Sequence, residues 1–349
     1  MKKIVKQVLG VDVAQKELVV CLGRIYDDLT LELYSHGTFS NTKKGFDTMI
    51  KWVRKLTTET TPIRYVMEAT GVYHESLAYH LEESNNEVSI ILPNKISNYF
   101  RTLEVKTITD KTASEAIARF GLERQLECWK RPKQIFKSLK QLTRERDQIV
   151  ETRTVAKNQL HAEMAEAFPN PSSVARVKKL IKLLDKQVAE IIQEITLTVK
   201  QDTEVNKSVE TICSIPGVGR LTAVTVLAET NGFELIRNKR QLTSYAGLDV
   251  REKQSGTSIK GKPRISKKGN RHLRKAMHLP ALAAIRHEEK FKAVFVRLVS
   301  KHGIKMKAAV AVQRKLLEMI YTVYKTNTNY KKDYQNLNDT KYETETCMA

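Results

Sequence analysis

The stretch KQVLGVDVAQKELVVCLG, residues 6–23, places a carboxylate, that of Asp12, inside a run of apolar residues. Apolar residues on either side of a short polar turn predict two buried strands joined by that turn. An isolated buried charge is costly unless it is paired or coordinates a metal ion. Asp12 is therefore a candidate functional residue, and its partners must come from elsewhere in the chain.

The chain is long and strongly basic. It has 349 residues and a net charge of +21. This length suits two or three domains, each with its own core. A protein this basic most often binds a polyanion, and nucleic acid is the foremost candidate. Because the charge is spread over the whole chain, a membrane surface is the weaker alternative.

The N-terminal residues and the cysteines predict a cytoplasmic protein without a membrane partner. Lys6 and Asp12 interrupt the first apolar run, which makes it a poor signal peptide, and no apolar stretch is long enough to span a bilayer. The cysteines lack the spacing of a zinc site, so we expect reduced thiols. They are Cys21, Cys128, Cys213 and Cys347.

The first section, residues 1–130, alternates strand and helix patterns. Apolar alternation predicts three successive strands, at 7–14, 17–25 and 29–39. Helices at 42–56, 71–84 and 110–123 then alternate with strands at 63–69 and 87–93. This order predicts an α/β domain with a mixed sheet flanked by helices.

The second section, residues 131–205, has a helical repeat. Apolar residues recur every seven positions from Ile135 to Ala156, and spacings of three and four return from Val177 to Ile195 after the breaker FPNPSS. The pattern predicts two long helices that form a coiled-coil hairpin or an oligomer seam. Arg146 and Arg153 occupy seam positions, which suits either an open, solvated coil or a functional basic seam.

The third section, residues 206–325, is mostly helical, with helices expected at 267–287 and 305–325. Its segment SIPGVGRLTAVTVLAE, residues 214–229, suits a helix-hairpin-helix element. Gly217 and Gly219 would let backbone N–H groups approach a phosphate at the start of a helix near Arg220. A plain turn between packed helices explains the pattern equally well. Residues 326–349 are polar, and we expect them to be disordered.

A dense basic stretch spans residues 245–277 and is almost free of acids. A solvated loop does not need such a density of positive charge, so we expect these side chains to neutralise phosphates. Each one taken singly is more often a backbone contact than a reader of bases. The candidates are Arg251, Lys253, Lys260, Lys262, Arg264, Lys267, Lys268, Arg271, Arg274 and Lys275.

Two more acids stand at the ends of predicted elements. Glu68 ends the strand at 63–69, and Asp110 begins the helix at 110–123. With Asp12 they could bind Mg²⁺, which prefers carboxylate and water oxygens, if the sheet places Asp12 and Glu68 on adjacent strands. In the alternative interpretation Asp110 is a helix N-cap and Glu68 is merely solvated.

Three segments, 10–20, 67–83 and 106–121, resemble the acidic motifs of the insertion sequence 110 family of transposases. The resemblance implies an N-terminal domain similar to the RuvC resolvase, of the ribonuclease H-like fold, with an Asp-Glu-Asp-Asp tetrad. Asp12, Glu68 and Asp110 match its first three acids. The fourth position is Ala113 here. Ser114 or Glu115 is the candidate to take its place.

Ser255, followed by Gly256, lies inside the basic stretch. A serine hydroxyl is a weak nucleophile unless its surroundings activate it, and most loop serines only form hydrogen bonds. The stretch resembles the C-terminal transposase domain of the same family, which implies that Ser255 forms a covalent phosphoserine link to DNA. Ser258 and Ser266 are the fallback candidates. We expect His272 and His278 on a helix surface or in the core.

The resemblance implies a bacterial, nucleoid-associated transposase that acts with Mg²⁺ on donor and target DNA. It further implies a structured guide RNA and a dimeric to tetrameric assembly in which the acids of one subunit meet the serine of another. Two alternatives remain. One is a metal-dependent nuclease for branched DNA in which Ser255 has no chemical role. The other, motivated by Ala113, is a non-catalytic nucleic-acid-binding protein.

Overall fold

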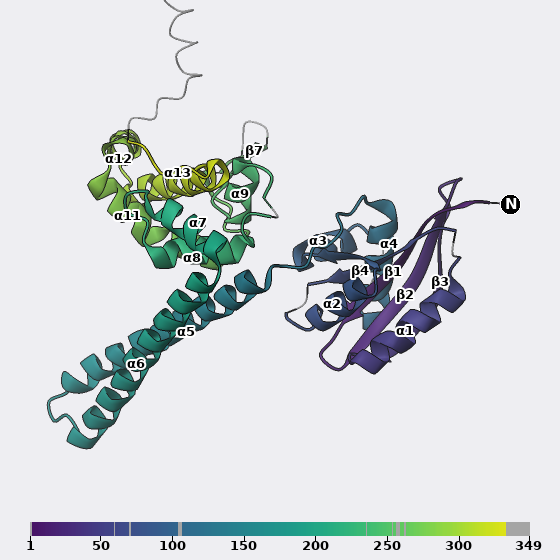
Figure 1. Cartoon of the computed structure of the whole chain (residues 1–349), viewed down its shortest axis with the longest axis horizontal. Coiled ribbons are helices and arrows are strands. Elements are labelled where there is room, and N and C mark those ends of the chain that lie inside the picture. The colour runs from purple at the N-terminus through teal and green to yellow at the C-terminus, as the bar shows by residue number, and fades with distance from the viewer. Residues whose placement is uncertain are drawn as a thin grey trace, which may run out of the picture. The chain divides into compact units, whose positions relative to one another are not determined.

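The computed structural model describes residues 2–58, 60–69, 71–103, 107–234, 236–252, 254–255, 259–261 and 263–332, with backbone alone for residues 254, 255, 259 and 260. The chain forms two compact units, Met1–Arg131 and Pro132–Ala349 (Figure 1). Within the described ranges, no helix has both the length and the apolar composition needed to cross a bilayer. The four-part division predicted from the sequence, with boundaries near 130, 205 and 325, stays a prediction.

The first unit is built on a five-stranded sheet. Its strands are β1 (Ile4–Val13), β2 (Glu17–Tyr26), β3 (Leu31–Ser40), β4 (Ile63–Glu68) and β5 (Glu87–Ile91). Their order is β3-β2-β1-β4-β5. The first three strands are antiparallel, and β4 runs parallel to β1 and β5. The predicted mixed sheet is therefore confirmed.

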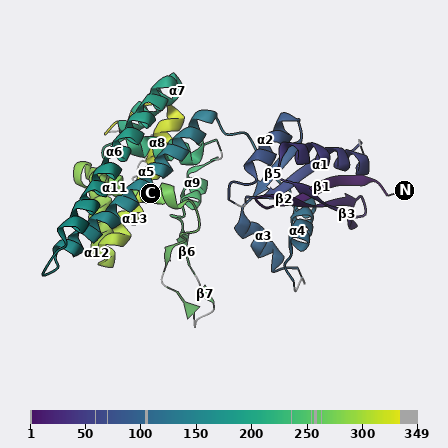
Figure 2. The same ribbon diagram turned by 90° about the horizontal axis from the view of Figure 1, so that it is seen from below.

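Helices cover both faces of this sheet. Figure 2 shows α1 (Lys43–Leu56) and α2 (Glu75–Glu83) on one face and α3 (Pro93–Phe100) and α4 (Asp110–Glu123) on the other. Helix α2 begins four residues later than predicted, and α3 was not predicted. With only eight residues, α3 is too short for its apolar period to be recognised.

Side-chain alternation along β1 assigns its residues to the two faces. Leu9 and Val11 pack into the cluster with α1 and α2, whereas Val8 packs with α4. Between them, a Cβ on Gly10 would lie 2.3 Å from the backbone nitrogen of Ala118, so α4 crosses directly over β1 at this glycine. Because the side-chain period of a strand is two, Asp12 shares the α4 face with Gly10.

The second unit begins with α5 (Gln134–Met164) and α6 (Pro171–Gln201), which lie side by side in both views (Figures 1 and 2). Ala156 packs against Val177 and Leu184 between them. The nitrogen of Arg153 lies 2.7 Å from the carboxylate of Asp185, so this seam position is an ion pair between the helices. The two predicted long helices are present, and a coiled-coil seam between subunits stays a prediction.

The remaining helices of this unit share one hydrophobic core with α13 (Lys305–Thr326), whose Leu316 and Ile320 are fully buried. They are α7 (Thr203–Cys213), α8 (Arg220–Thr230), α9 (Lys239–Tyr245), α10 (Arg271–Ala276), α11 (His278–His287) and α12 (Glu289–His302). The helix predicted at 267–287 is thus two helices, α10 and α11. The segment expected to be a disordered tail lies largely outside the described residues.

The basic stretch between α9 and α10 contains two small antiparallel ladders. Strand β6 (Val250–Arg251) pairs with β9 (Arg264–Ile265), and β7 (Gln254–Ser255) pairs with β8 (Ile259–Lys260). These strands were not predicted, because two residues carry no recognisable period.

Candidate active site

Strand register brings Asp12 and Glu68 to the same place on the sheet. In the parallel pairing of β1 with β4, Val11 is opposite Met67, and Asp12 and Glu68 are the next residues of the two strands. Val66, two residues before Glu68, packs in the cluster that contains residues of α4. Glu68 therefore shares the α4 face with Asp12, as the sequence interpretation required.

Helix α4 brings Asp110 toward this pair. A Cβ on Gly121 would lie 2.8 Å from Val8, and one on Gly10 would lie 2.4 Å from the carbonyl oxygen of Ser114. The helix thus runs opposite to β1, with its N-terminus over the end of the strand that carries Asp12. Asp110 is its first residue and is exposed.

The N-cap of α4 is Thr109, not Asp110. The Thr109 hydroxyl accepts a hydrogen bond from the backbone nitrogen of Thr112, and the Thr112 side chain accepts one from the backbone nitrogen of Thr109. This reciprocal arrangement is a capping box. The alternative interpretation of Asp110 as a simple N-cap is therefore wrong, because Thr109, the residue before it, is the N-cap.

The charges of the other two acids act on Asp12. Burial raises the pKa of Asp12 to about 6, with further contributions from the charges of Asp110 and Glu68. Mutual repulsion of this kind is relieved by a cation, and carboxylate oxygens are suitable ligands for a divalent one. Among the residues described, however, no three His, Cys, Asp or Glu side chains already form a group that could hold a metal ion. The three carboxylates therefore do not form a ready-made ligand shell in this conformation.

The two candidates for the fourth ligand have other contacts. Ser114 is fully buried, and its hydroxyl donates a 2.7 Å hydrogen bond to the carbonyl oxygen of Lys111. The Glu115 carboxylate lies 2.9 Å from Nε2 of His36 on β3. Ala113 supplies no acid. These contacts favour neither Ser114 nor Glu115 as a metal ligand.

His36 is a polar residue of this face that the sequence analysis missed. In the sheet register His36 lies opposite Cys21, and Cys21 lies opposite Gly10. His36 is therefore level with Gly10, two residues before Asp12 along β1. Its partner Glu115 is 79 positions away in the sequence. The one available signal was a polar residue within a predicted strand, and that signal does not identify the partner.

The structure places Ser255 on the ladder of β7 and β8. Its backbone pairs with that of Ile259, and its side chain lies outside the described atoms. Lys253, Gly256, Ser258 and Lys262 are also outside the described residues. The third serine, Ser266, donates a 2.5 Å hydrogen bond to the carboxylate of Asp249, which makes it a structural residue in this conformation.

The described basic residues of this stretch divide into two groups. One group is exposed and consists of Arg251, Arg264, Lys267, Lys268 and Arg271. Arg251 and Arg264 even lie opposite each other on β6 and β9, an unfavourable pairing of like charges that a bound phosphate would relieve. Arg274 is partly buried and donates to the carbonyl oxygen of Ala246. Lys275 is also exposed, but its amino group is paired with the exposed carboxylate of Glu151.

The two glycines of the predicted hairpin have different surroundings. Gly217 has a φ of +87°, and a Cβ there would lie 2.6 Å from the backbone nitrogen of Ala284, so it permits close packing on α11. Gly219 precedes α8, and a Cβ there would meet nothing within 4 Å. Arg220 donates to the side chain of Asn206 at 2.6 Å. A plain packed turn explains Gly217, and Gly219 leaves room for a ligand.

His272 and His278 have the internal or partly buried positions expected of them. The Nδ1 atom of His278 lies 2.9 Å from the amide nitrogen of Gln313, which is buried. His272 is half-buried, and burial, followed by the charge of Arg144, lowers its pKa.

Known proteins resemble this chain over between about half and nearly all of its length. The pilin gene-inverting protein of Moraxella lacunata is 27% identical over 333 residues, which cover 94% of this chain and 98% of the relative. The transposase for insertion sequence element IS1111A of Coxiella burnetii is 28% identical over 165 residues, 45% of this chain and 44% of the relative. The transposase for IS1328 of Yersinia enterocolitica is 23% identical and covers 62% of this chain and 69% of the relative.

Among solved structures, RuvC of T. thermophilus in complex with a Holliday junction substrate aligns with a TM-score of 0.28 and 10% identity, covering 35% of this chain and 99% of RuvC. A transposase family model of the DEDD type for IS110 matches residues 9–169, which contain the three acids. The model described as "Transposase IS116/IS110/IS902 family" matches residues 209–295, which contain Ser255. Since models of one transposase family match both the region of the three acids and the region of Ser255, the chain belongs to the IS110 family of transposases.

Proposed function

We propose that this insertion-sequence transposase cuts and rejoins DNA through Asp12, Glu68 and Asp110 in one unit and the hydroxyl of Ser255 in the other. The observation that supports the proposal is the position of Asp12 and Glu68 on adjacent strands of one face, with the N-terminus of α4, which carries Asp110, over the same end of β1. Burial of Asp12 beside two further acids is unfavourable without a ligand, which is typical of a functional site.

The chemistry follows from the two groups. The Ser255 hydroxyl gives up its proton as its oxygen attacks the scissile phosphorus, a serine–phosphate ester forms, the bond to one deoxyribose oxygen breaks, and that oxygen takes up a proton. Attack by the deoxyribose hydroxyl of another strand then releases Ser255 and completes the exchange. Mg²⁺ held by the carboxylates of Asp12, Glu68 and Asp110 would supply charge neutralisation at the phosphate.

The exposed cations of the basic stretch would hold DNA at the serine. Arg251, Arg264 and Arg271 face solvent on the same stretch as Ser255. They are suited to phosphate oxygens, and arginine in such positions can also stabilise the charge that develops during transfer. We further propose a structured guide RNA, a dimeric to tetrameric assembly, and action in the cytoplasm.

The test of the nucleophile is a search for a protein–DNA adduct. Full-length protein is incubated with Mg²⁺ and a donor DNA nicked next to the cleavage site, and the products are separated under denaturing conditions. Wild-type protein and Ser266→Ala should trap the adduct, whereas Ser255→Ala and Asp12→Asn should form none while still binding DNA.

Other outcomes would replace the proposal. An adduct that persists in Ser255→Ala assigns the nucleophile elsewhere. Cleavage by the wild type without any adduct would favour the metal-dependent nuclease for branched DNA. If the wild type binds DNA and neither cleaves nor forms an adduct, the non-catalytic alternative motivated by Ala113 is favoured.

A second candidate function is inversion of a DNA segment between two sites of one molecule. A relative that covers 94% of this chain is a pilin gene-inverting protein. Inversion would use the same serine and the same acids, and only the arrangement of the two DNA sites would differ. A plasmid with two sites in inverted orientation, scored for inversion or for excision, separates the two functions.

A further inference from the structure

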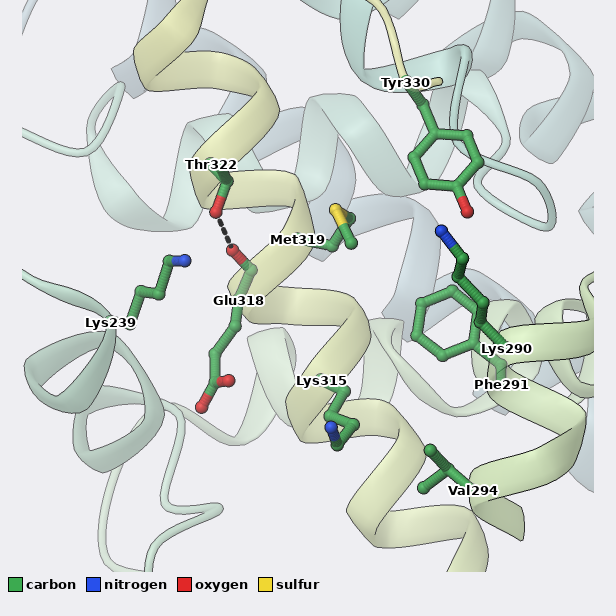
Figure 3. Close-up of a pocket in the computed structure, with 9 residues that line it drawn as sticks. All are labelled: Lys239, Lys290, Phe291, Val294, Lys315, Glu318, Met319, Thr322 and Tyr330. Carbon is green, nitrogen blue, oxygen red and sulfur yellow. Dashed lines mark hydrogen bonds between the residues drawn. The ribbon is translucent and has the colours of Figure 1, made fainter. Parts of the chain in front are cut away.

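A pocket of about 270 Å³ opens in the second unit, on the side formed by α9, α12 and α13 (Figure 3). None of the residues that line it belongs to the three acids or to the basic stretch around Ser255. The proposed strand chemistry therefore does not account for this pocket.

The inner part of the pocket is apolar. Phe291 and Val294 of α12 contribute to it, together with Met319 of α13. Phe291 is only 5% exposed, so its ring is a fixed part of the floor. The phenol ring of Tyr330, after the end of α13, adds a second aromatic surface (Figure 3). This lining suits a flat, apolar group.

Three lysines surround this floor: Lys239, Lys290 and Lys315. The side-chain amino groups of Lys239 and Lys315 form no hydrogen bond or ion pair with any residue that the structure describes. The single acid of the lining, Glu318, lies 3.0 Å from Nε of Arg314 and is thereby largely balanced. The lining thus has an excess of positive charge, which suits an anion.

The segment after α13 is held in place beside the pocket. The backbone nitrogen of Tyr330 donates a 2.7 Å hydrogen bond to the hydroxyl of Ser214 on the chain after α7. The amino group of Lys290 donates a 2.5 Å hydrogen bond to the carbonyl oxygen of Lys332. Side chains from three helices and this segment therefore form one defined concavity.

We infer that this pocket takes one unstacked nucleotide of a bound single strand, with its base between Phe291, Met319 and Tyr330 and its phosphates at Lys239 and Lys315. An aromatic platform next to cations is the combination by which proteins hold unpaired bases. The net charge of +21 supports nucleic acid over other anions. The inference requires that the chain binds nucleic acid, and it does not require the chemistry of Ser255.

Photocrosslinking with 5-iodouracil tests the inference, because this base forms bonds with aromatic side chains that it contacts. Full-length protein is irradiated with pools of single strands that carry one such base each, one pool of DNA and one of RNA. Mass spectrometry then locates the adducts. We expect them on the peptides of Phe291 or Tyr330, in the DNA arm, the RNA arm or both, and the arm identifies the source of the nucleotide.

The test variant is Lys239→Ala with Lys315→Ala. Its matched control is Lys301→Ala with Lys307→Ala, which removes the same charge from exposed positions of α12 and α13 outside the pocket. The test variant should lose at least roughly tenfold in pocket adducts, because it removes both lysines proposed to hold the phosphates. The control and Ser255→Ala should keep them, which separates this inference from the proposed strand chemistry.

Three results would overturn the inference. One is that adducts form only outside the pocket in both arms. Another is an equal loss of adducts in the test variant and in the control. The third is that pocket adducts appear only after Asp333, Asp339, Glu343 and Glu345 are replaced by their amides, which would mean that the end of the chain itself occupies the pocket.

Discussion

The charge of Asp12, which the proposed function needs, opposes the stability of the folded chain. It lies half-buried on β1, and burial together with the charges of Asp110 and Glu68 raises its pKa from 3.8 to about 6. The unfolded chain holds the same carboxylate at its ordinary pKa. Folding at neutral pH therefore confines a charge that the environment disfavours, as is common where function opposes stability.

Replacement of Asp12 by asparagine should therefore stabilise the metal-free protein. The pKa of Asp12 is raised in the folded state, so the charged carboxylate lowers the free energy of unfolding. This loss of stability is complete above about pH 6 and disappears below pH 3.8, the pKa of the unfolded chain. The pKa shift corresponds to a gain of at most about 3 kcal/mol in the free energy of unfolding, and we expect a gain of about 1 kcal/mol because Asp12 is only half-buried. Urea unfolding of Asp12→Asn should show this gain at pH 8 and none at pH 3.5. The exposed Asp27→Asn is the control, and an equal gain there, or a loss at pH 8 in Asp12→Asn, would contradict the argument.

At the scale of elements, a buried polar network joins α5, α8 and α10. The side chain of Glu229 is fully buried at the end of α8, and Arg144 of α5 donates to both of its oxygens, at 2.7 and 2.9 Å. Asn270, the N-cap of α10, donates to the same carboxylate at 2.7 Å. Burial alone would raise the pKa of Glu229, but these hydrogen bonds outweigh it and the pKa is lowered. The network attaches the basic stretch, at its end in α10, to the long hairpin.

Loss of Arg144 should weaken the whole second unit. Arg144→Ala leaves the carboxylate of Glu229 buried with one partner, and breaking such a pair costs about 3 kcal/mol. The loss should be greatest at neutral pH and shrink in acid, because a lowered pKa stabilises the fold only while the carboxylate is charged. Thermal unfolding at pH 7 and pH 4 measures this difference. Arg153 lies on the same helix as Arg144, and Arg153→Ala removes an ion pair with the half-exposed carboxylate of Asp185 on α6, which should cost well under 1 kcal/mol. Equal losses for the two variants would refute the role of the network.

The elements also show what the sequence could and could not predict. The strands around Asp12 and the two long helices were predictable because their apolar periods extend over many residues. The two-residue ladders around Ser255 and the eight-residue α3 have no such period. The proximity of Asp12 and Glu68 depends on β1 and β4 being neighbours in the sheet, which the sequence supplied only as a condition and the structure shows. The pairing of His36 with Glu115 depends on how α4 lies on the sheet, and no local pattern encodes it.

At the scale of the whole molecule, the proposed chemistry is divided between two compact units. The three acids lie within Met1–Arg131, and Ser255 lies within Pro132–Ala349. Each unit has its own hydrophobic core, so a variant in one should leave the other folded. A chemical site divided in this way can be assembled from a single copy or from two copies of the chain, and the two possibilities differ in a measurable respect.

We expect complementation between the two kinds of inactive protein, because the proposed assembly joins the acids of one copy to the serine of another. Asp12→Asn retains Ser255, and Ser255→Ala retains the acids, so mixed oligomers contain intact composite sites. The mixture, refolded or coexpressed to allow exchange of subunits, should recover adduct formation that neither variant shows alone. A mixture of Asp12→Asn with Asp110→Asn is the control and should stay inactive, because both variants damage the same unit. If mixed oligomers form and remain as inactive as this control, the acids and the serine must act within one copy.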